Sequence, residues 1–313
     1  MQPRIIFMGT PEFAVPSLQI LVEAGYEVVA VVTATDKMGG RGGKKLLQSA
    51  VKKYAVDQGI PVLQPKNLKA PEFIEELASY QADLQIVVAF RMLPVAVWDM
   101  PRLGTFNLHG SLLPKYRGAA PINWAVIQGE TETGVTTFFI QHEIDTGDIV
   151  FQERMPIGPD ETAGEVHDRM MQLGAQTVLK TVKAIAAGEV SAKLQDHSLA
   201  TPAPKLKAEN TQIDFSQDAH AVHNFIRGLN PFPGAWTLFD GQKWKILRTV
   251  VLEESHELAS GTIQTDNKSY LHIATGNGYV DVQELQIPGK RRMAVKDFLN
   301  GWDFAENAPR FGS

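Results

Sequence analysis

Residues Glu27–Thr33 read EVVAVVT, a nearly continuous run of β-branched and apolar residues. A strand buried on both faces has this composition, and such strands belong to parallel sheets that helices cover on both sides. Before this run, Phe13–Ala24 carries apolar residues at helical spacing and stops at Gly25, a typical residue just after a helix. The short apolar segment Arg4–Met8 predicts a first strand. The sequence therefore opens with the strand–helix–strand order of an α/β sheet.

The alternation of strands and helices continues to about residue 190. Helices are predicted over Leu46–Gln58, Pro71–Tyr80 and Glu165–Ala187, and strands over Leu84–Ala89, Thr105–His109 and Gly134–Phe139. This order indicates an α/β fold with a doubly wound, mostly parallel, Rossmann-like sheet. Ligands of such sheets bind beyond the carboxyl ends of the strands, so we expect the functional side chains there.

The composition changes near residue 190. Residues 191–207 contain two prolines and few large apolar side chains, which is typical of a linker. After them come one predicted helix and short alternating runs that indicate a small β-barrel or sandwich. The helix is Ala219–Arg227, and the runs are Ala235–Phe239, Lys243–Val251, Gly261–Gln264, Tyr270–Ala274 and Tyr279–Leu285. We therefore predict an α/β domain over residues 1–190, a linker over 191–207 and a smaller β domain over 208–313.

Composition limits the class of protein. The chain has 313 residues, of which 44% are hydrophobic and 21% charged, as expected for two packed domains. The absence of cysteine excludes a catalytic thiol, disulfides and thiolate metal sites, and is compatible with the reducing cytoplasm where we expect the protein. The sequence shows no signal peptide and no apolar stretch long enough to cross a membrane. No apolar stripe predicts a partner subunit, so we expect a monomer. The net charge of −5 gives no general attraction to nucleic acid, so such a partner would need local basic patches.

Several familiar motifs are incomplete. The first strand ends in Gly9–Phe13, GTPEF, with one glycine where a dinucleotide-binding loop needs three, so a nicotinamide-dependent dehydrogenase is disfavoured. The loop Lys37–Lys45, KMGGRGGKK, lacks the spacing of a phosphate-binding Walker loop. His220 and His223 are three residues apart on a predicted helix, but no third ligand is evident, so we expect no metal site.

Residues 104–118, GTFNLHGSLLPKYRG, contain the most informative pattern. Because side chains alternate along a strand, Asn107 and His109 share one face, and the strand stops at Gly110. Asn supplies an amide donor, and His can donate, accept or carry a proton near neutral pH. The pair suits a reaction in which a carbonyl oxygen becomes an oxyanion and a proton moves.

An acidic partner for the imidazole is available further along the chain. The segment QHEIDTGDIV offers Asp145 and Asp148 in a loop before a strand. A structural explanation competes with the catalytic one. Asn and His at a strand end can cap loops, and Asp-Thr-Gly-Asp is common in turns.

The segments NLHGSLLP (Asn107–Pro114), KYRG (Lys115–Gly118) and DTGD (Asp145–Asp148) together resemble the signature of the folate-dependent formyltransferases. The resemblance implies that Asn107, His109 and Asp145 form a catalytic trio, with 10-formyltetrahydrofolate as formyl donor and no metal. In that family Asn107 would donate to the oxyanion, and His109 would stabilise it and move a proton. Asp145 would orient the imidazole and favour its protonated form.

The resemblance also places the folate. The backbone of the segment after the strand Thr105–His109 would line the folate site, together with the loop near residue 90. The implied folate-binding residues are Ser111, Leu112, Leu113, Pro114, Val88, Phe90, Arg91 and Leu93. Within VVAFRMLP (Val87–Pro94), one residue shorter than the common family pattern, Arg91 replaces a usual glycine, which leaves the path of this loop open.

Other segments are similar to family members that formylate methionyl initiator tRNA for translation initiation. They are FMGTPEF (Phe7–Phe13), GRGGKK (Gly40–Lys45), RGAAPI (Arg117–Ile122) and Lys205-Leu206. This similarity implies a formyltransferase catalytic domain over 1–190 and an OB-like tRNA-binding domain over 208–313. It also implies that Arg41, Lys44 and Lys45 contact tRNA, although a solvated basic loop is the plain alternative.

Two other functions stay open. A 10-formyltetrahydrofolate-dependent formyltransferase could act on an amino-sugar nucleotide or another small amine. A protein that only binds RNA or folate would not need the complete set of Asn107, His109 and Asp145. A protein that only binds RNA is expected to have a generally basic surface. The net charge of −5 gives no sign of one, so this function is disfavoured.

Overall fold

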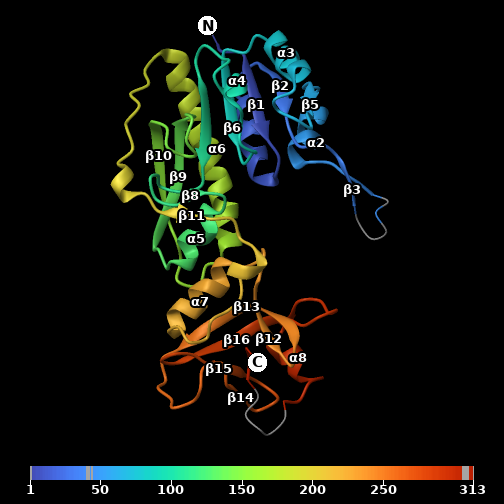
Figure 1. The fold of residues 1–313 in the computed structure, drawn as a ribbon, viewed down its shortest axis with the longest axis vertical. Helices are drawn as coiled ribbons and strands as arrows, with labels where there is room; N and C mark the ends of the chain where they lie inside the picture. The colour runs from blue at the N-terminus through green and yellow to red at the C-terminus, as the bar shows by residue number, and fades with distance from the viewer. Residues whose placement is uncertain (1, 40–42, 44, 305–309, 313) are drawn as a thin grey trace. The chain divides into compact units, whose positions relative to one another are not determined.

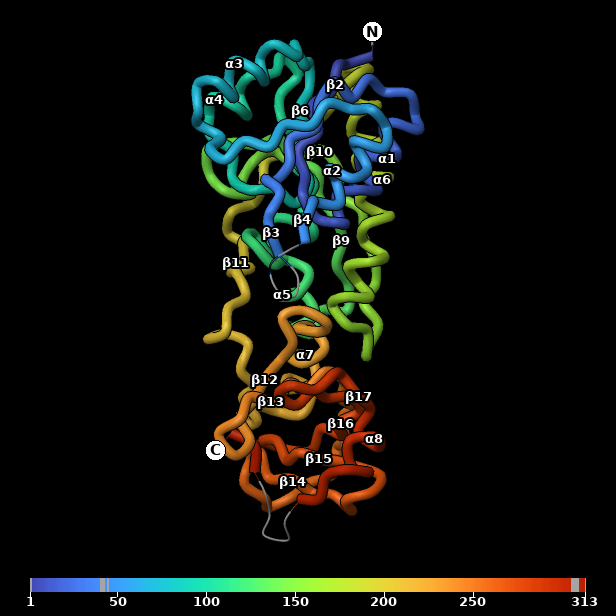
Figure 2. The backbone as a smooth tube through the Cα atoms, turned by 90° about the vertical axis from the view of Figure 1, so that its right-hand side faces the viewer, coloured from blue at the N-terminus to red at the C-terminus, as the bar shows by residue number. Residues whose placement is uncertain are grey.

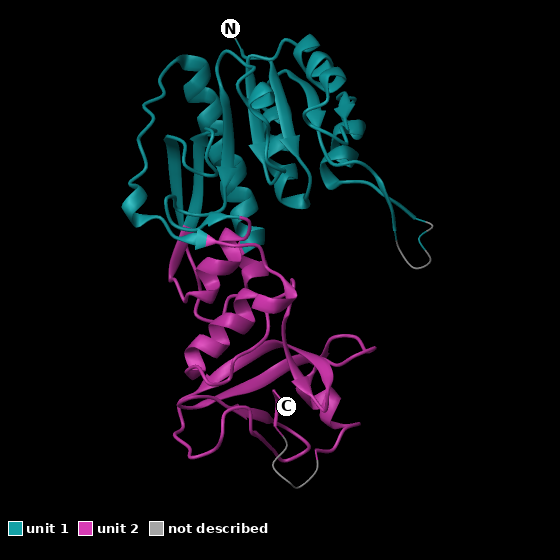
Figure 3. Ribbon diagram, in the orientation of Figure 1, with its two compact units in different colours: residues 1–118, 134–155, 167–202 teal, residues 119–133, 156–166, 203–313 magenta. Residues whose placement is uncertain are grey.

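The computed structural model describes residues 2–39, 43, 45–304 and 310–312. The chain forms two compact units (Figure 3). Unit 1 comprises Met1–Gly118, Gly134–Met155 and His167–Pro202, and unit 2 comprises Ala119–Thr133, Pro156–Val166 and Ala203–Ser313. Unit 2 therefore takes two of its segments from within the first 190 residues.

Unit 1 is built on a seven-stranded sheet with the order β10-β9-β7-β6-β1-β2-β5 (Figure 1). The strands are β1 (Ile5–Gly9), β2 (Val28–Val32), β5 (Val62–Leu63), β6 (Leu84–Val88), β7 (Thr105–His109), β9 (Glu132–Phe139) and β10 (Ile149–Pro156). The strands from β5 to β7 in this order are parallel, and β9 runs antiparallel to β7. The central strands are buried throughout, which explains their nearly continuous apolar sequences.

Helices cover both faces of this sheet. They are the 3-10 helix η1 (Glu12–Ala14) and α1 (Val15–Glu23), α2 (Ala50–Asp57), α3 (Pro71–Ser79), α4 (Val95–Trp98) and α6 (Ala163–Ala187). In the side view of Figure 2, α3 and α4 lie on one side of the sheet and α1 and α6 on the other. Ile6 and Met8 pack with Phe73 of α3 on the first side. On the second, Gly174 of α6 lies against Leu108 of β7.

The predicted helix Leu46–Gln58 is wrong at its beginning. Residues Lys45–Leu47 form β4, which pairs antiparallel with β3 (Lys37–Gly39). The helix begins at Ala50 because the Ser49 hydroxyl accepts the Lys52 amide at 3.0 Å, a typical N-cap. Apolar spacing alone did not distinguish the two leucines of a strand from the first turn of a helix.

Unit 2 contains a curled antiparallel sheet with the order β12-β13-β16-β15-β14, and β17 pairs with β16. The strands are β12 (Ala235–Phe239), β13 (Gln242–Leu252), β14 (Ile263–Thr265), β15 (Leu271–Ala274), β16 (Tyr279–Gln286) and β17 (Met293–Ala294). The helices are α5 (Pro121–Ile127), α7 (Ala219–Gly228) and α8 (Val295–Leu299). The predicted fold class, a mostly parallel Rossmann-like sheet followed by a smaller antiparallel β domain, is confirmed.

Two contacts organise unit 2. Trp244 is 1% exposed and lies at the centre of an aromatic core with Phe239, Phe298 and Phe311. Separately, α5 packs on α7 so closely that a Cβ on Gly228 would lie 2.5 Å from Ile127 Cγ1. The first segment of unit 2 is thus joined to the last by side-chain packing.

Among the described residues, no helix combines the length and hydrophobicity needed to cross a membrane. The same residues contain no cluster of three or more His, Asp or Glu side chains arranged to hold a metal ion.

Candidate active site

Strand β7 places Asn107 and His109 on one face. Phe106 and Leu108, on the other face, are buried in the core. His109 is 6% exposed, whereas Asn107 is partly exposed. In the part of the chain that the structure describes, the Asn107 side chain makes no hydrogen bond. Its amide donors are therefore available to a substrate oxygen.

The imidazole of His109 lies between two oxygen acceptors. Its Nε2 donates to the Tyr116 carbonyl oxygen at 2.8 Å, and its Nδ1 is 3.7 Å from Asp145 Oδ2. A neutral imidazole has one N–H, so only the protonated ring can donate toward both oxygens. The structure thus brings together two of the predicted trio, with an oxygen acceptor facing each nitrogen of the ring.

The backbone of two chain segments fixes the carboxylate of Asp145: the loop after β9, which carries it, and Gly118, which binds it. Asp145 has a left-handed φ of 56°, and its Oδ2 accepts the Gly118 amide at 2.9 Å. Two residues later, a Cβ on Gly147 would lie 1.6 Å from the Phe139 carbonyl oxygen, so only glycine fits. Asp148, the other predicted candidate, contributes its backbone oxygen to the Phe139 amide.

Gln195 joins this loop to the rest of the site, and sequence reasoning missed it. Its Nε2 donates to the carbonyl oxygens of Asp145 at 3.0 Å and Gly147 at 2.7 Å. Its Oε1 accepts Nη2 of Arg117 at 2.6 Å. No sequence signal identifies it, because Gln195 lies in a polar segment predicted as a linker.

The turn Ser111–Pro114, predicted to line the folate, is held by one buried threonine. The Thr136 hydroxyl donates to the Ser111 carbonyl at 2.7 Å and accepts the Leu113 amide at 3.1 Å. Gln152 donates to the same hydroxyl and, at 2.8 Å, to the Leu113 carbonyl. These bonds fix the path of the backbone immediately after the strand that carries His109.

The second predicted folate segment follows β6. Val88 is fully buried, Leu93 is 9% exposed, and Phe90 lies partly exposed between them. Arg91 donates to the carbonyl oxygens of Pro65 and Lys66 and lies over the Phe90 ring at 5.6 Å. The left-handed residue of this loop is Ala89, at φ 48°. The loop therefore takes its turn before Arg91, whose side chain ties it to the segment after β5.

Of the predicted tRNA contacts, Arg41 and Lys44 lie outside the described residues. Lys45 is exposed on the β3–β4 pair, which Figure 1 shows projecting from the sheet. Asp36, just before β3, accepts a hydrogen bond from Lys52 Nζ of α2 at 2.6 Å and so fixes the start of the β3–β4 pair. That hydrogen bond from Lys52 holds the pKa of Asp36 below its usual value.

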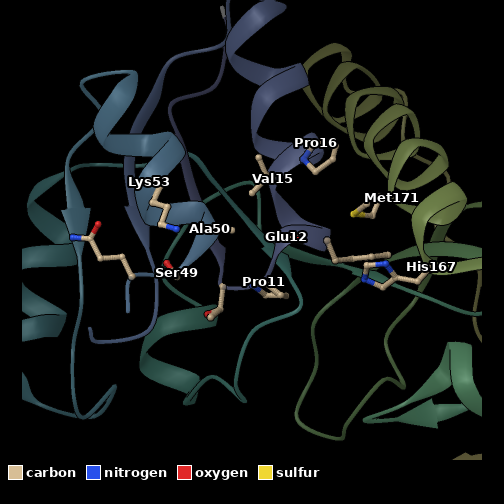
Figure 4. Close-up of a pocket in the computed structure, with 12 residues that line it drawn as sticks. Pro11, Glu12, Val15, Pro16, Ser49, Ala50, Lys53, His167 and Met171 are labelled. Atoms are coloured by element: carbon tan, nitrogen blue, oxygen red, sulfur yellow. The ribbon is translucent and has the colours of Figure 1, made fainter. Parts of the chain in front are cut away.

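A pocket of about 830 Å³ opens just beyond β1. Figure 4 shows Pro11 and Glu12 between Lys53 of α2 and His167 of α6. The lining residues are Thr10, Pro11, Glu12, Phe13, Val15, Pro16, Gln48, Ser49, Ala50, Lys53, His167 and Met171. The pocket lies at the carboxyl end of a central strand, where sheets of this class bind ligands. Four of its lining residues, Thr10–Phe13, belong to the segment FMGTPEF, whose sequence resembles family members but does not by itself indicate a pocket.

Two family models cover nearly the whole chain. The Formyl transferase model matches residues 3–182, and the model of the Formyl transferase C-terminal domain matches residues 205–303. The chain belongs to the formyl transferase family. The folate-dependent resemblance inferred from the NLHGSLLP and DTGD segments is thereby confirmed at the level of the family.

Individual formyl transferases are similar over their full length. A methionyl-tRNA formyltransferase of Bacteroides fragilis is 51% identical over 312 residues, covering 97% of this chain and 96% of its own. The methionyl-tRNA formyltransferase of Parabacteroides distasonis is 52% identical over 309 residues, covering 96% and 95%.

Solved formyl transferase structures share the fold at lower identity. WlaRD, a sugar 3N-formyl transferase solved with dTDP and 5-N-formyl-THF, has a TM-score of 0.67 and 20% identity, covering 93% of this chain and all of its own. HypX from Aquifex aeolicus, solved with tetrahydrofolic acid, has a TM-score of 0.63 and 18% identity, covering 100% of this chain and 51% of its own. At these identities the likeness establishes the fold alone.

Proposed function

We propose that this chain transfers the formyl group of 10-formyltetrahydrofolate to the amino group of methionine on initiator tRNA, for translation initiation. The observation that carries the proposal is about 50% identity to methionyl-tRNA formyltransferases across nearly the whole chain. The site supports it, because a hydrogen-bond donor and a buried imidazole–carboxylate pair lie at the carboxyl end of β7.

The chemistry requires one bond to form and another to break. The neutral methionyl nitrogen attacks the formyl carbon, and the formyl oxygen becomes an oxyanion. The bond from carbon to N10 of the folate then breaks, N10 gains a proton, and the new amide nitrogen loses one. We assign the Asn107 amide to the oxyanion, because its donors are unoccupied and hydrogen bonds to developing charge lower the barrier.

We assign His109 and Asp145 to the oxyanion and to the movement of the proton. The ring of His109 faces an oxygen acceptor at each nitrogen, so its orientation is suited to hold and pass on a proton beside the reacting groups. The Nε2 proton, donated to the Tyr116 carbonyl in this structure, is the one we assign to the oxyanion and the leaving N10. Asp145 holds the opposite nitrogen and balances the positive charge.

We place the folate against Ser111–Pro114 and Val88–Leu93. The first segment is fixed by Thr136 and Gln152, and the second by the bonds of Arg91, so each presents a defined surface. Apolar side chains of the second segment, Phe90 among them, suit the flat pteridine ring.

For the tRNA we propose contacts by Arg41, Lys44 and Lys45. The β3–β4 pair supports this role, because it exposes Met38, Leu46 and Leu47 at 63%, 53% and 46%. Large apolar side chains exposed together commonly mark a surface that binds a partner. The domain spanning residues 208–313 is proposed as a further tRNA-binding surface.

Replacing Arg41 by alanine is expected to raise the KM for methionyl-tRNA about tenfold, because a lost phosphate contact weakens binding of the nucleic acid. The KM for 10-formyltetrahydrofolate should stay within about twofold. Steady-state kinetics with each substrate varied in turn measure both values. Arg102→Ala, which removes an exposed arginine near the amino end of β7, is the matched control. An unchanged KM for tRNA in Arg41→Ala would remove this loop from the binding site.

The acceptor is tested by a formyl-transfer assay with three amines side by side. We expect 10-formyltetrahydrofolate to formylate methionyl initiator tRNA, and to leave glycinamide ribonucleotide and an amino-sugar nucleotide unmodified. Product formation is followed by mass spectrometry. Formylation of only a small amine would keep the chemistry and overturn the acceptor, in favour of the alternative that the sequence left open.

A further inference from the structure

Gln195 is a buried polar side chain with every hydrogen-bonding position occupied. It is 5% exposed and lies in a segment after α6 that is anchored where Lys193 and Ile149 exchange backbone hydrogen bonds. Both protons of its Nε2 go to backbone carbonyls, and its Oε1 accepts Nη2 and Nε of Arg117 at 2.6 and 3.3 Å. A buried amide satisfied in this way has a fixed position and orientation.

The chemistry of its neighbours fixes which end of the amide faces which partner. Arginine only donates, so the Gln195 oxygen must face Arg117. The carbonyls of Asp145 and Gly147 only accept, so the nitrogen must face them. A flipped amide would lose all of these bonds and bring like groups together.

The two carbonyls that Gln195 binds belong to the loop that carries the Asp145 carboxylate. Asp145 has a left-handed backbone, a conformation that non-glycine residues keep only where surrounding contacts enforce it. Gly147 is already fixed against Phe139, so a second bond at Asp145 sets the backbone between them. The carboxylate direction depends on that backbone.

The same side chain also reaches the other wall of the site through Arg117. Arg117 is followed by Gly118, whose amide donates to Asp145 Oδ2 at 2.9 Å. It is preceded by Tyr116, whose carbonyl accepts from His109. Gln195 therefore ties together the two chain segments that meet the imidazole and its carboxylate.

We propose that Gln195 is a positioning residue for catalysis, which holds the Asp145 carboxylate toward His109 by fixing the loop Asp145–Gly147. The inference rests on the proposed function, since it assumes that Asp145 acts in formyl transfer. Small displacements of a catalytic group cost rate rather than substrate affinity.

Two variants of the full chain separate the roles of the amide. Gln195→Met keeps the volume and removes all four hydrogen bonds. Gln195→Glu keeps an acceptor for Arg117 but has no donor for the carbonyls of Asp145 and Gly147. Both should lower kcat about 10- to 100-fold and leave the KM for each substrate within about twofold. If Gln195→Met fails to fold, Gln195→Glu still carries the test.

The matched control is His197→Ala. It removes the other acceptor of Arg117, His197 Nδ1 at 3.2 Å from Nη1, without touching the loop of Asp145. Its kcat should stay within about twofold of the parent. A larger loss in His197→Ala than in Gln195→Glu would assign the effect to Arg117 and overturn the proposal.

A double-mutant cycle with Asp145→Asn decides whether Gln195 acts through that carboxylate. If it does, Gln195→Met should cost several-fold less in the Asp145→Asn background than in the parent. Equal losses in both backgrounds, or wild-type kcat in both single variants of Gln195, would overturn the inference. Failure of the proposed function has a different signature, because then the parent itself would not formylate methionyl-tRNA, or Asp145→Asn would keep its activity.

Discussion

Replacing His109 by alanine is expected to lower kcat for formyl transfer about 10³-fold, within the range lost when a general acid or base is removed. In the proposed mechanism the ring supplies the proton that N10 needs to leave, and its two nitrogens face the Tyr116 carbonyl and Asp145. The KM values should change little, because the ring contributes to the transition state more than to binding. Single-turnover formylation of methionyl-tRNA measures the chemical step directly.

The control for this variant is His142→Ala. His142 lies exposed in the same loop as Asp145 and has no assigned role, so its loss should leave kcat within about twofold. Circular dichroism and thermal melting would confirm that both variants fold. A folded His109→Ala protein with kcat within tenfold of the parent would contradict the proposed mechanism.

Replacing Trp244 by alanine is expected to lower the free energy of unfolding of unit 2 by about 3–5 kcal/mol, because a large buried side chain leaves a cavity. Its ring contacts Phe239 at 5.0 Å, Trp302 at 5.2 Å and Phe298 at 5.4 Å between centroids, so several aromatic neighbours lose their packing at once. Denaturant unfolding, followed by circular dichroism, measures the change.

Trp236→Ala is the matched comparison. Trp236 is partly exposed, lies under Lys243 Nζ at 3.9 Å and donates to the Ala208 carbonyl at 3.1 Å. Its removal opens no enclosed cavity, so the loss should be less than half of that for Trp244. Equal losses would mean that Trp244 is not the centre of this core.

The strands were predicted well where their buried positions carry apolar or β-branched residues. Thr105–His109 and Ala235–Phe239 have the predicted bounds, because an alternating or β-branched run ends there at a clear turn residue. Strand β10 (Ile149–Pro156) was expected only as a strand after the loop of Asp145 and Asp148, and its bounds were not predicted. It lies at the edge of the sheet, where exposed positions carry charged residues such as Arg154 and the apolar pattern is weak.

The candidate site was predictable to the extent that it is local. Asn107 and His109 lie on one face because side chains alternate along a strand, and this holds in any fold that contains the strand. The choice of Asp145 over Asp148 came from the family resemblance, because only the folded chain shows which carboxylate faces the imidazole. Gln195 could not be predicted, since its partner Asp145 is 50 residues away and a polar segment with few apolar side chains gives no sign of burial.

Because α5 packs on α7, the chain cannot be cut into two independently folding fragments between these helices. Ile127 belongs to the first half of the chain, yet it covers Gly228 and joins the core of unit 2. A fragment ending at residue 190 would keep Ile127 and lose Gly228, exposing one side of α5 to water. A chimera joined near residue 203 would likewise pair an α5 from one parent with an α7 from another. Recombination between relatives therefore has to preserve residues 121–127 together with the C-terminal segment, although more than 70 residues separate them along the chain.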